Sequence, residues 1–287
     1  MMSGEPTVAG RWVIRHQTVY RYSTQVVFAP HTLRLTPRTD STRCVQRSLV
    51  VTPQPLELTE LADELGNGIT RVTFGAGSSN ELVFDSQLLV ETFTRSQQLG
   101  GQWLPPLPWN APYPDSLFAY RQPDGSFEVS ALGQRIAAEV GYAPLEFFER
   151  LCQTLHATLD HQIRVEGAAQ RPAETLATGS GACRDSTLLF LAVCRSLGVA
   201  GRFVSGYQGQ EATPDGKRHL HAWPEVFVPG LGWLGWDPTH GVPVGPGHVA
   251  LSAAPGQTGT MPVDGGFYFN GPTVTSTLSY SISFDPA

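Results

Sequence analysis

The first third of the chain alternates short runs of β-forming residues with turn residues. Segment 11–22 is rich in Val, Tyr and Thr, and its polar and apolar residues alternate toward its end, which is typical of a strand with one packed face. Gly66-Asn67-Gly68 is a hairpin signal. Further segments of the same character are 48–52, 69–74 and 82–92. We therefore expect an antiparallel β-structure in this part of the chain.

The pattern becomes helical after the prolines of 104–108, which mark a linker. Apolar residues at three- and four-residue spacing predict helices over 130–139 and 144–159, the second of which begins at Pro144. Segment 184–197 is nearly all apolar between glycines, as expected of a helix that passes through the core. Strand character returns in 202–207, 222–228, 233–236 and 278–284.

These patterns divide the 287 residues into four parts. We expect a β-rich N-terminal domain (1–105), a linker (106–126), an α+β core (127–245) and a β-rich C-terminal tail (246–287) that packs back on the protein. The length is sufficient for two ordinary domains.

Charge and composition exclude several partners. The net charge is −6 and there is no Lys/Arg-rich stripe, so we expect no nucleic-acid partner. The apolar stretches are too short to cross a bilayer, and the N-terminus lacks the pattern of a secretory signal. We therefore predict a cytoplasmic protein that does not interact with membranes and whose cysteines are free thiols. The oligomeric state is left open.

Cys183 is the one cysteine with the setting of a reactive thiol. If Ser180 is the N-cap of the predicted helix, Cys183 lies in its first turn, where unpaired N–H groups and the helix dipole stabilise a thiolate. Cys194 lies three turns deeper in the same apolar helix, and Cys152 and Cys44 have the settings of packing residues in a helix and a strand.

A nucleophilic cysteine needs a base. His221 begins one predicted strand, and Asp237 ends the next and could orient the imidazole. If Val228 faces Trp233 across the hairpin, the two side chains lie on opposite faces of the sheet. One extra residue would bring them to the same face, so a triad requires a β-bulge near Pro224.

Four sequence blocks occur in one order along the chain. They are Gly181-Ala182-Cys183-Arg184-Asp185, Gly206-Tyr207, His221-Ala222-Trp223-Pro224-Glu225-Val226 and Gly232-Trp233-Leu234-Gly235-Trp236-Asp237-Pro238-Thr239. In this combination the chain resembles the transglutaminase-like superfamily, and more narrowly its bacterial branch, whose members are often labelled cysteine proteases. Residues 11–92, and notably Asp63–Gly68, are similar to the β-rich N-terminal domain of that branch.

The resemblance implies a papain-related α+β core in which the cysteine lies on a helix and the histidine and aspartate on an antiparallel sheet. By motif position, Cys183 matches the nucleophile, His221 the base and Asp237 the orienting acid. The implied activity is cysteine-dependent acyl transfer at the amide bonds of a protein or peptide through a thioester. Water as acceptor gives a peptidase or amidohydrolase, and an amine gives a protein-glutamine transamidase.

Other details of the site are less defined by the sequence. The backbone N–H of Cys183 is a candidate oxyanion donor, and Gln162 is a possible second one. Three tryptophans, Trp223, Trp233 and Trp236, either wall a substrate tunnel or pack in the core. No cofactor or metal is expected, and no acidic Ca²⁺ loop is present.

Two alternatives stay open. A metal site could use His219, His221, Asp237 and His240, because His-x-His on a strand places two imidazoles on one face, but this leaves the setting of Cys183 unexplained. Otherwise His219, His240 and His248 are expected to be solvated residues of loops or of the rim. The second alternative is a non-catalytic protein-binding module on the same fold.

Overall fold

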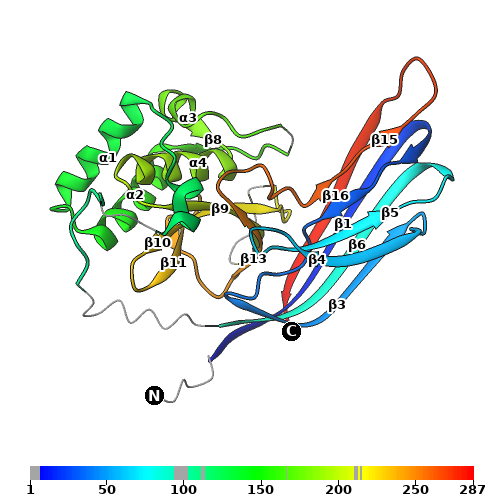
Figure 1. Cartoon of the computed structure of the whole chain (residues 1–287), viewed down its shortest axis with the longest axis horizontal. Coiled ribbons are helices and arrows are strands. Elements are labelled where there is room, and N and C mark those ends of the chain that lie inside the picture. The colour runs from blue at the N-terminus through cyan, green and yellow to red at the C-terminus, as the bar shows by residue number, and fades with distance from the viewer. Residues whose placement is uncertain (1–6, 94–102, 111–113, 166, 210–212, 214) are drawn as a thin grey trace.

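The computed structural model describes residues 7–93, 103–110, 114–165, 167–209, 213 and 215–287. The molecule has an elongated β-rich region on one side and a mixed region of helices and sheet on the other (Figure 1). The α+β class expected from the sequence is confirmed. The helices all belong to the mixed region and are η1 (a 3-10 helix, Asp115–Arg121), α1 (Phe127–Glu139), α2 (Pro144–Thr158), α3 (Pro172–Thr178) and α4 (Cys183–Ser196).

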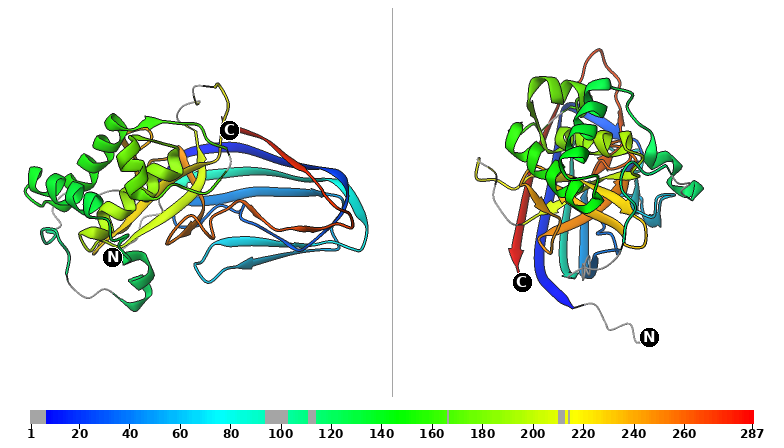
Figure 2. Two further views of the ribbon diagram at one scale, coloured as in Figure 1. Left: turned by 90° about the horizontal axis from the view of Figure 1, so that it is seen from above. Right: turned by 90° about the vertical axis from the view of Figure 1, so that its left-hand side faces the viewer.

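The β-rich region consists of two antiparallel sheets with strands from both ends of the chain. The larger has the order β15-β1-β6-β3, with β16 also paired to β1, and the smaller has the order β14-β2-β5-β4. The C-terminal strand therefore runs beside the N-terminal one (Figures 1 and 2). The strand bounds are β1 (Val8–Phe28), β2 (His31–Leu33), β3 (Thr42–Thr52), β4 (Glu57–Ala62), β5 (Gly68–Thr73), β6 (Ser78–Phe93), β14 (Val263–Asp264), β15 (Phe267–Tyr268) and β16 (Ser276–Pro286).

Alternation along β1 separates its two faces. Ile14, His16 and Thr18 are buried, whereas Val13 and Arg15 are exposed, as the two-residue period of a strand requires. The inner face packs against the smaller sheet. The shared hydrophobic cluster includes Ile14, Leu33, Val72, Leu82, Phe84 and Leu88.

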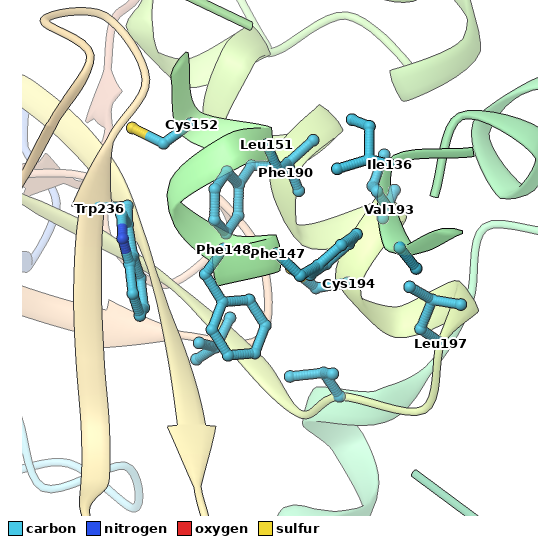
Figure 3. Packing of buried hydrophobic residues seen from close by; sticks show 14 of the residues in the cluster. Ile136, Phe147, Phe148, Leu151, Cys152, Phe190, Val193, Cys194, Leu197 and Trp236 are labelled. Carbon is cyan, nitrogen blue, oxygen red and sulfur yellow. The ribbon is translucent and has the colours of Figure 1, made fainter. Parts of the chain in front are cut away.

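The mixed region is built on an antiparallel sheet with the order β12-β11-β10-β9-β13. Helix α4 contacts β9 and β10 on one side and α1, α2 and α3 on the other. Phe147 and Phe148 of α2, Phe190 of α4 and Trp236 of β11 are buried together in this core (Figure 3). The strands are β9 (Gly201–Gln208), β10 (His221–Val228), β11 (Gly232–Asp237), β12 (Val242–Pro243) and β13 (His248–Ala254).

The two regions share buried side chains. Tyr207 of β9 and Val249 and Leu251 of β13 belong to the hydrophobic cluster of the β-rich region. Packing across this boundary therefore fixes how the long strands lie against the helical region.

Asn67 adds a polar connection at the same boundary. Its fully buried side chain accepts a hydrogen bond from the N–H of Ala253 at 2.8 Å and donates to the carbonyl of Ala253 at 3.0 Å. Its amide also donates to Asp63 at 2.9 Å. The side chain of Asn67 thus satisfies both backbone groups of Ala253 in β13.

The structure differs from the sequence-based division at residue 246. Strand β13 was assigned to the C-terminal tail, but it pairs with β9 in the sheet of the mixed region. All seven of its residues are buried, so it lacks the alternation by which a half-exposed strand is recognised. Within the described ranges, no helix has the length and apolar content needed to span a membrane.

Candidate active site

Cys183 is the first residue of α4, and its neighbours define where the helix begins. The N-cap is Ala182 rather than the expected Ser180, which lies in the short strand β8 (Ser180–Gly181). The N–H of Ala182 donates to Asp185 at 2.7 Å. A Cβ at Gly181 would lie 2.8 Å from the Cβ of Asp185, so this close approach requires glycine. The thiol lies where free N–H groups and the helix dipole stabilise a thiolate.

Asp185 anchors the loop that precedes the nucleophile. Its carboxylate is fully buried and accepts hydrogen bonds from Arg164 at 2.7 and 2.9 Å and from the N–H of Gln170 at 2.8 Å. A buried carboxylate with this many charge-assisted and backbone partners holds its surroundings in one arrangement. The start of α4, where Cys183 lies, is therefore held in one position.

His221 and Asp237 meet across the neighbouring strands. His221 is the first residue of β10, Asp237 is the last of β11, and the imidazole Nε2 lies 2.8 Å from Oδ2 of the carboxylate. His221 also acts on the thiol of Cys183, whose pKa it lowers. Because Nε2 faces Asp237, Nδ1 is the nitrogen that is available to the sulfur. The structure brings the three predicted residues together.

The way in which the sheet achieves this differs from the prediction. The expected register paired Val228 with Trp233, but Val228 pairs with Gly232, and no bulge interrupts the hairpin. This shift of one residue is enough to bring Asp237 to the same face as the histidine. The predicted bulge near Pro224 is therefore wrong, because the turn is shorter than assumed.

The charges of the site stabilise one another. Burial alone would raise the pKa of the Cys183 thiol, but the hydrogen bond and charge of His221 outweigh it and lower that pKa. Burial opposes charge on His221 as well, yet Asp237 and the thiol raise its pKa to about 10. The pKa of Asp237 lies well below its usual value, against burial and because of His221. A thiolate–imidazolium pair is the favoured state.

Asp237 has more partners than the sequence suggested. Its Oδ2 accepts from three imidazoles, His221 and His240 at 2.8 Å and His248 at 3.1 Å. Its Oδ1 accepts from the N–H of Thr239 at 3.0 Å. The expectation that His240 and His248 are solvated is wrong, since His248 is buried and both hold this carboxylate in place.

A metal ion would have to displace these hydrogen bonds. Ligand atoms of His221, Asp237 and His240 lie within 4.8 Å of one another, which is compatible with a metal site. His219 is not part of this group, because its nitrogens face Tyr280 and Asp215. The other three residues already hydrogen-bond directly, so we interpret the group as the support of the imidazole.

A cavity of about 510 Å³ contains the thiol and the imidazole. One wall is the inner face of β1 and β16, which contributes His16, Tyr20 and Tyr280, and the opposite wall includes Arg164 and Arg184. The cavity therefore lies between the two regions. None of the three tryptophans considered as a tunnel wall belongs to the described lining.

Gln162 does line the cavity, but its amide donates to Asp160 at 2.6 Å. This bond holds one of its two amide hydrogens. The backbone N–H of Cys183 keeps its place as candidate oxyanion donor at the start of the helix.

Comparison with known proteins agrees with this geometry. Residues 13–91 match the bacterial transglutaminase-like N-terminal region, and residues 131–238 match the transglutaminase-like superfamily. The chain belongs to the transglutaminase-like superfamily. The two matches correspond to the first strands of the β-rich region and to the transglutaminase-like core.

Two proteins show how this transglutaminase-like protein compares with its relatives in sequence; the first is described as uncharacterized. A Mycobacterium tuberculosis (strain H37Rv) protein is 25% identical over 294 residues, which cover 96% of this chain and 93% of that protein. A protein-glutamine gamma-glutamyltransferase of Pseudomonas aeruginosa is 41% identical over 71 residues, 23% of this chain and 11% of that protein.

One solved structure shares the fold over almost the whole length. It is that of a "putative cysteine protease" from Cytophaga hutchinsonii, with a TM-score of 0.71 and 19% identity over 98% of this chain and 91% of that chain. The arrangement of a β-rich region beside a transglutaminase-like core is thus found in another protein of low sequence identity.

Proposed function

We propose that this protein catalyses cysteine-dependent acyl transfer at amide bonds of a protein or peptide substrate, with Cys183 as nucleophile. One observation carries the proposal: Cys183 begins α4 and shares a cavity with His221, and that imidazole is held at 2.8 Å by Asp237. A structural cysteine needs neither the imidazole nor the cavity.

The proposed reaction has two halves. The thiolate of Cys183 attacks the amide carbonyl carbon, the C–N bond breaks, and the imidazolium of His221 gives its proton to the leaving amine. A thioester on Cys183 results. In the second half a nucleophile attacks the thioester, its proton passes to His221, and the C–S bond breaks to restore the thiolate.

The nucleophile decides the outcome. Water gives a peptidase or amidohydrolase, and a primary amine gives a protein-glutamine transamidase. An aromatic tunnel that keeps water out would favour the amine, but Trp223 and Trp236 are buried in the core and lie outside the described cavity lining. We therefore propose hydrolysis as the default outcome, and transamidation when an amine is bound.

Intact-mass spectrometry after reaction with p-nitrophenyl acetate tests the nucleophile. We expect one acetyl group on Cys183 in the parent protein and none in Cys183→Ala, whereas Cys194→Ala reacts like the parent. The mass of a glutamine-containing peptide after incubation with a labelled primary amine then separates the two outcomes, because hydrolysis gives the free acid and transamidation gives the labelled amide. Acetylation of Cys183→Ala at the parental rate would contradict the proposal and favour the binding-module alternative.

A further inference from the structure

A second histidine–carboxylate pair lies on the cavity wall, apart from the three residues of the proposed mechanism. Nε2 of His219 lies 2.9 Å from Oδ2 of Asp215, and its Nδ1 lies 2.6 Å from the phenol oxygen of Tyr280. Tyr280 belongs to β16 of the β-rich region, and the other two residues precede β10 of the core. Tyr280 and His219 line the same cavity as Cys183.

With His219 in its neutral form, the protons of this group have one consistent arrangement. The hydroxyl of Thr213 lies 2.6 Å both from Asp215 and from the carbonyl of Lys217, and the N–H of Lys217 donates to Asp215 at 3.0 Å. These bonds, with that of His219, lower the pKa of Asp215 to about 2. The carboxylate is therefore ionised and accepts the Nε2 proton of His219. Its Nδ1 then carries a lone pair and accepts the phenol proton of Tyr280.

This arrangement determines what Tyr280 offers to the cavity. Its single proton is held by His219, so the remaining lone pairs of the phenol oxygen can only accept hydrogen bonds. Burial raises the pKa of Tyr280, and the negative charges of Asp215 and Cys183 raise it further. The phenol therefore keeps its proton and lies within electrostatic range of the nucleophilic sulfur.

An acceptor on this wall suits a molecule with an N–H or O–H to donate. The thioester carbonyl has none, but the nucleophile of the second half-reaction does, whether it is water or a primary amine. We propose that Tyr280, oriented by His219 and Asp215, accepts a hydrogen bond from the nucleophile that resolves the thioester on Cys183. This inference rests on the proposed function.

The proposed step balances without any proton transfer through the phenol. The nucleophile holds one of its hydrogens toward Tyr280 while its lone pair forms the bond to the carbonyl carbon. Another of its protons passes to His221, and the C–S bond to Cys183 breaks. Tyr280 keeps its own proton on the side of His219 throughout, so it is a positioning group rather than an acid or base.

The test separates formation of the thioester from its decay. Cys183 is acetylated with p-nitrophenyl acetate, the reagent is removed by rapid desalting, and loss of the acetyl group is followed by intact mass in buffer and with added glycinamide. In Tyr280→Phe we expect formation within about 2-fold of the parent and decay about 10-fold slower, the effect of one lost hydrogen bond. Asp215→Asn is expected to slow decay in the same direction.

Tyr268→Phe is the matched control, because Tyr268 is an exposed tyrosine of the same sheet and lies outside the described cavity lining. We expect parental formation and decay. Slow decay in buffer, with glycinamide, or in both supports the inference and identifies the nucleophile that is positioned.

Three results would overturn it: unchanged decay in Tyr280→Phe, formation and decay reduced by the same factor, or equal slowing in Tyr268→Phe. If the parent protein forms no acetyl-Cys183 at all, the proposed function fails and this inference fails with it. If the parent is acetylated normally and Tyr280→Phe decays normally, only this inference fails.

Discussion

The two ends of helix α4 carry the same side chain in opposite settings. Cys183 is the first residue of the helix, beside a cavity and an imidazole, whereas Cys194 is fully buried among apolar side chains (Figure 3). Burial raises the pKa of Cys194 well above its usual value. It acts in the same direction on Cys183, but there His221 reverses the result. The two thiols therefore differ in the direction of their pKa shift because only Cys183 has a positive partner.

Cys152 shows that the partner must be the imidazole. Burial raises the pKa of its thiol to about 12, and the nearby charge of Asp237 contributes in the same direction. The charge of Asp237 acts in the same direction on Cys183, but there His221, whose own pKa Asp237 raises, outweighs it. A thiol that lies near Asp237 without that histidine therefore has a raised pKa.

Removal of each thiol gives the largest contrast. We expect Cys183→Ala to reduce acyl transfer by a factor of about 10⁴ or more, as loss of a nucleophile does. Cys194→Ala is expected to keep the rate within about 3-fold while lowering the free energy of unfolding by about 1–2 kcal/mol through a small cavity. Rates with p-nitrophenyl acetate and urea unfolding measure both. Similar loss of rate in the two variants would mean that the ends of the helix do not differ chemically.

Asp237→Asn tests the role of the carboxylate. We expect a loss of about 10²–10⁴ in the acetylation rate at pH 7, because the imidazole loses its negative partner and its orientation. Asp285→Asn, at an exposed position of β16, is the control and should react as the parent does. A rate within 3-fold of the parent would show that His240 and His248 surround Asp237 for stability alone.

The ion pairs also predict a pH dependence of stability. The pKa of His221 is raised from 6.5 to about 10 in the folded protein, so its contribution is complete below pH 6.5 and is lost as the pH rises through 10. The pKa of Asp237 is lowered in the folded protein, so its contribution to stability is present above the ordinary pKa of an aspartate. That contribution is lost as the pH falls through the lowered pKa. We expect the free energy of unfolding of the parent to exceed that of His221→Asn most near pH 5–6. This excess should be about 1–3 kcal/mol larger there than at pH 10. Urea unfolding of both proteins at pH 5.5, 7.5 and 10 tests this, and a difference that grows with pH would contradict it.

The smallest effect concerns the boundary between the two regions. Asn67→Ala removes the hydrogen bonds to Ala253 and leaves its backbone groups without them, which we expect to lower the free energy of unfolding by about 1–3 kcal/mol. Alkylation of Cys183 should change little, because the triad lies within the transglutaminase-like core. Asn80→Ala, at an exposed position, is the control. Loss of Cys183 reactivity in Asn67→Ala alone would mean that docking of the β-rich region is needed to activate the thiol.

The sequence predicted the parts of the molecule that depend on local order. The apolar body of α4 identified a core helix, and the blocks around Cys183, His221 and Asp237 identified the residues that the structure brings together. The superfamily suggested by those blocks is confirmed by the family matches.

The missed features depend on long-range packing. His248 reaches Asp237 from β13, a strand without alternation, and Tyr280 enters the cavity from a strand that pairs with the other end of the chain. His240 had a usable signal, since it lies three residues after Asp237 in the turn that this carboxylate caps. The hairpin register differs from the prediction because only residues 229–231 separate the paired Val228 and Gly232.

Alkylation by iodoacetamide across pH, with the modified cysteine mapped by mass spectrometry, tests the thiolate–imidazolium pair most directly. We expect Cys183 to react ahead of Cys44, Cys152 and Cys194, with a midpoint below the ~8.5 of an ordinary thiol, and His221→Ala to abolish that preference. If Cys183 instead reacts as an ordinary or buried thiol in both proteins, the pair does not exist and Cys183 is not the nucleophile.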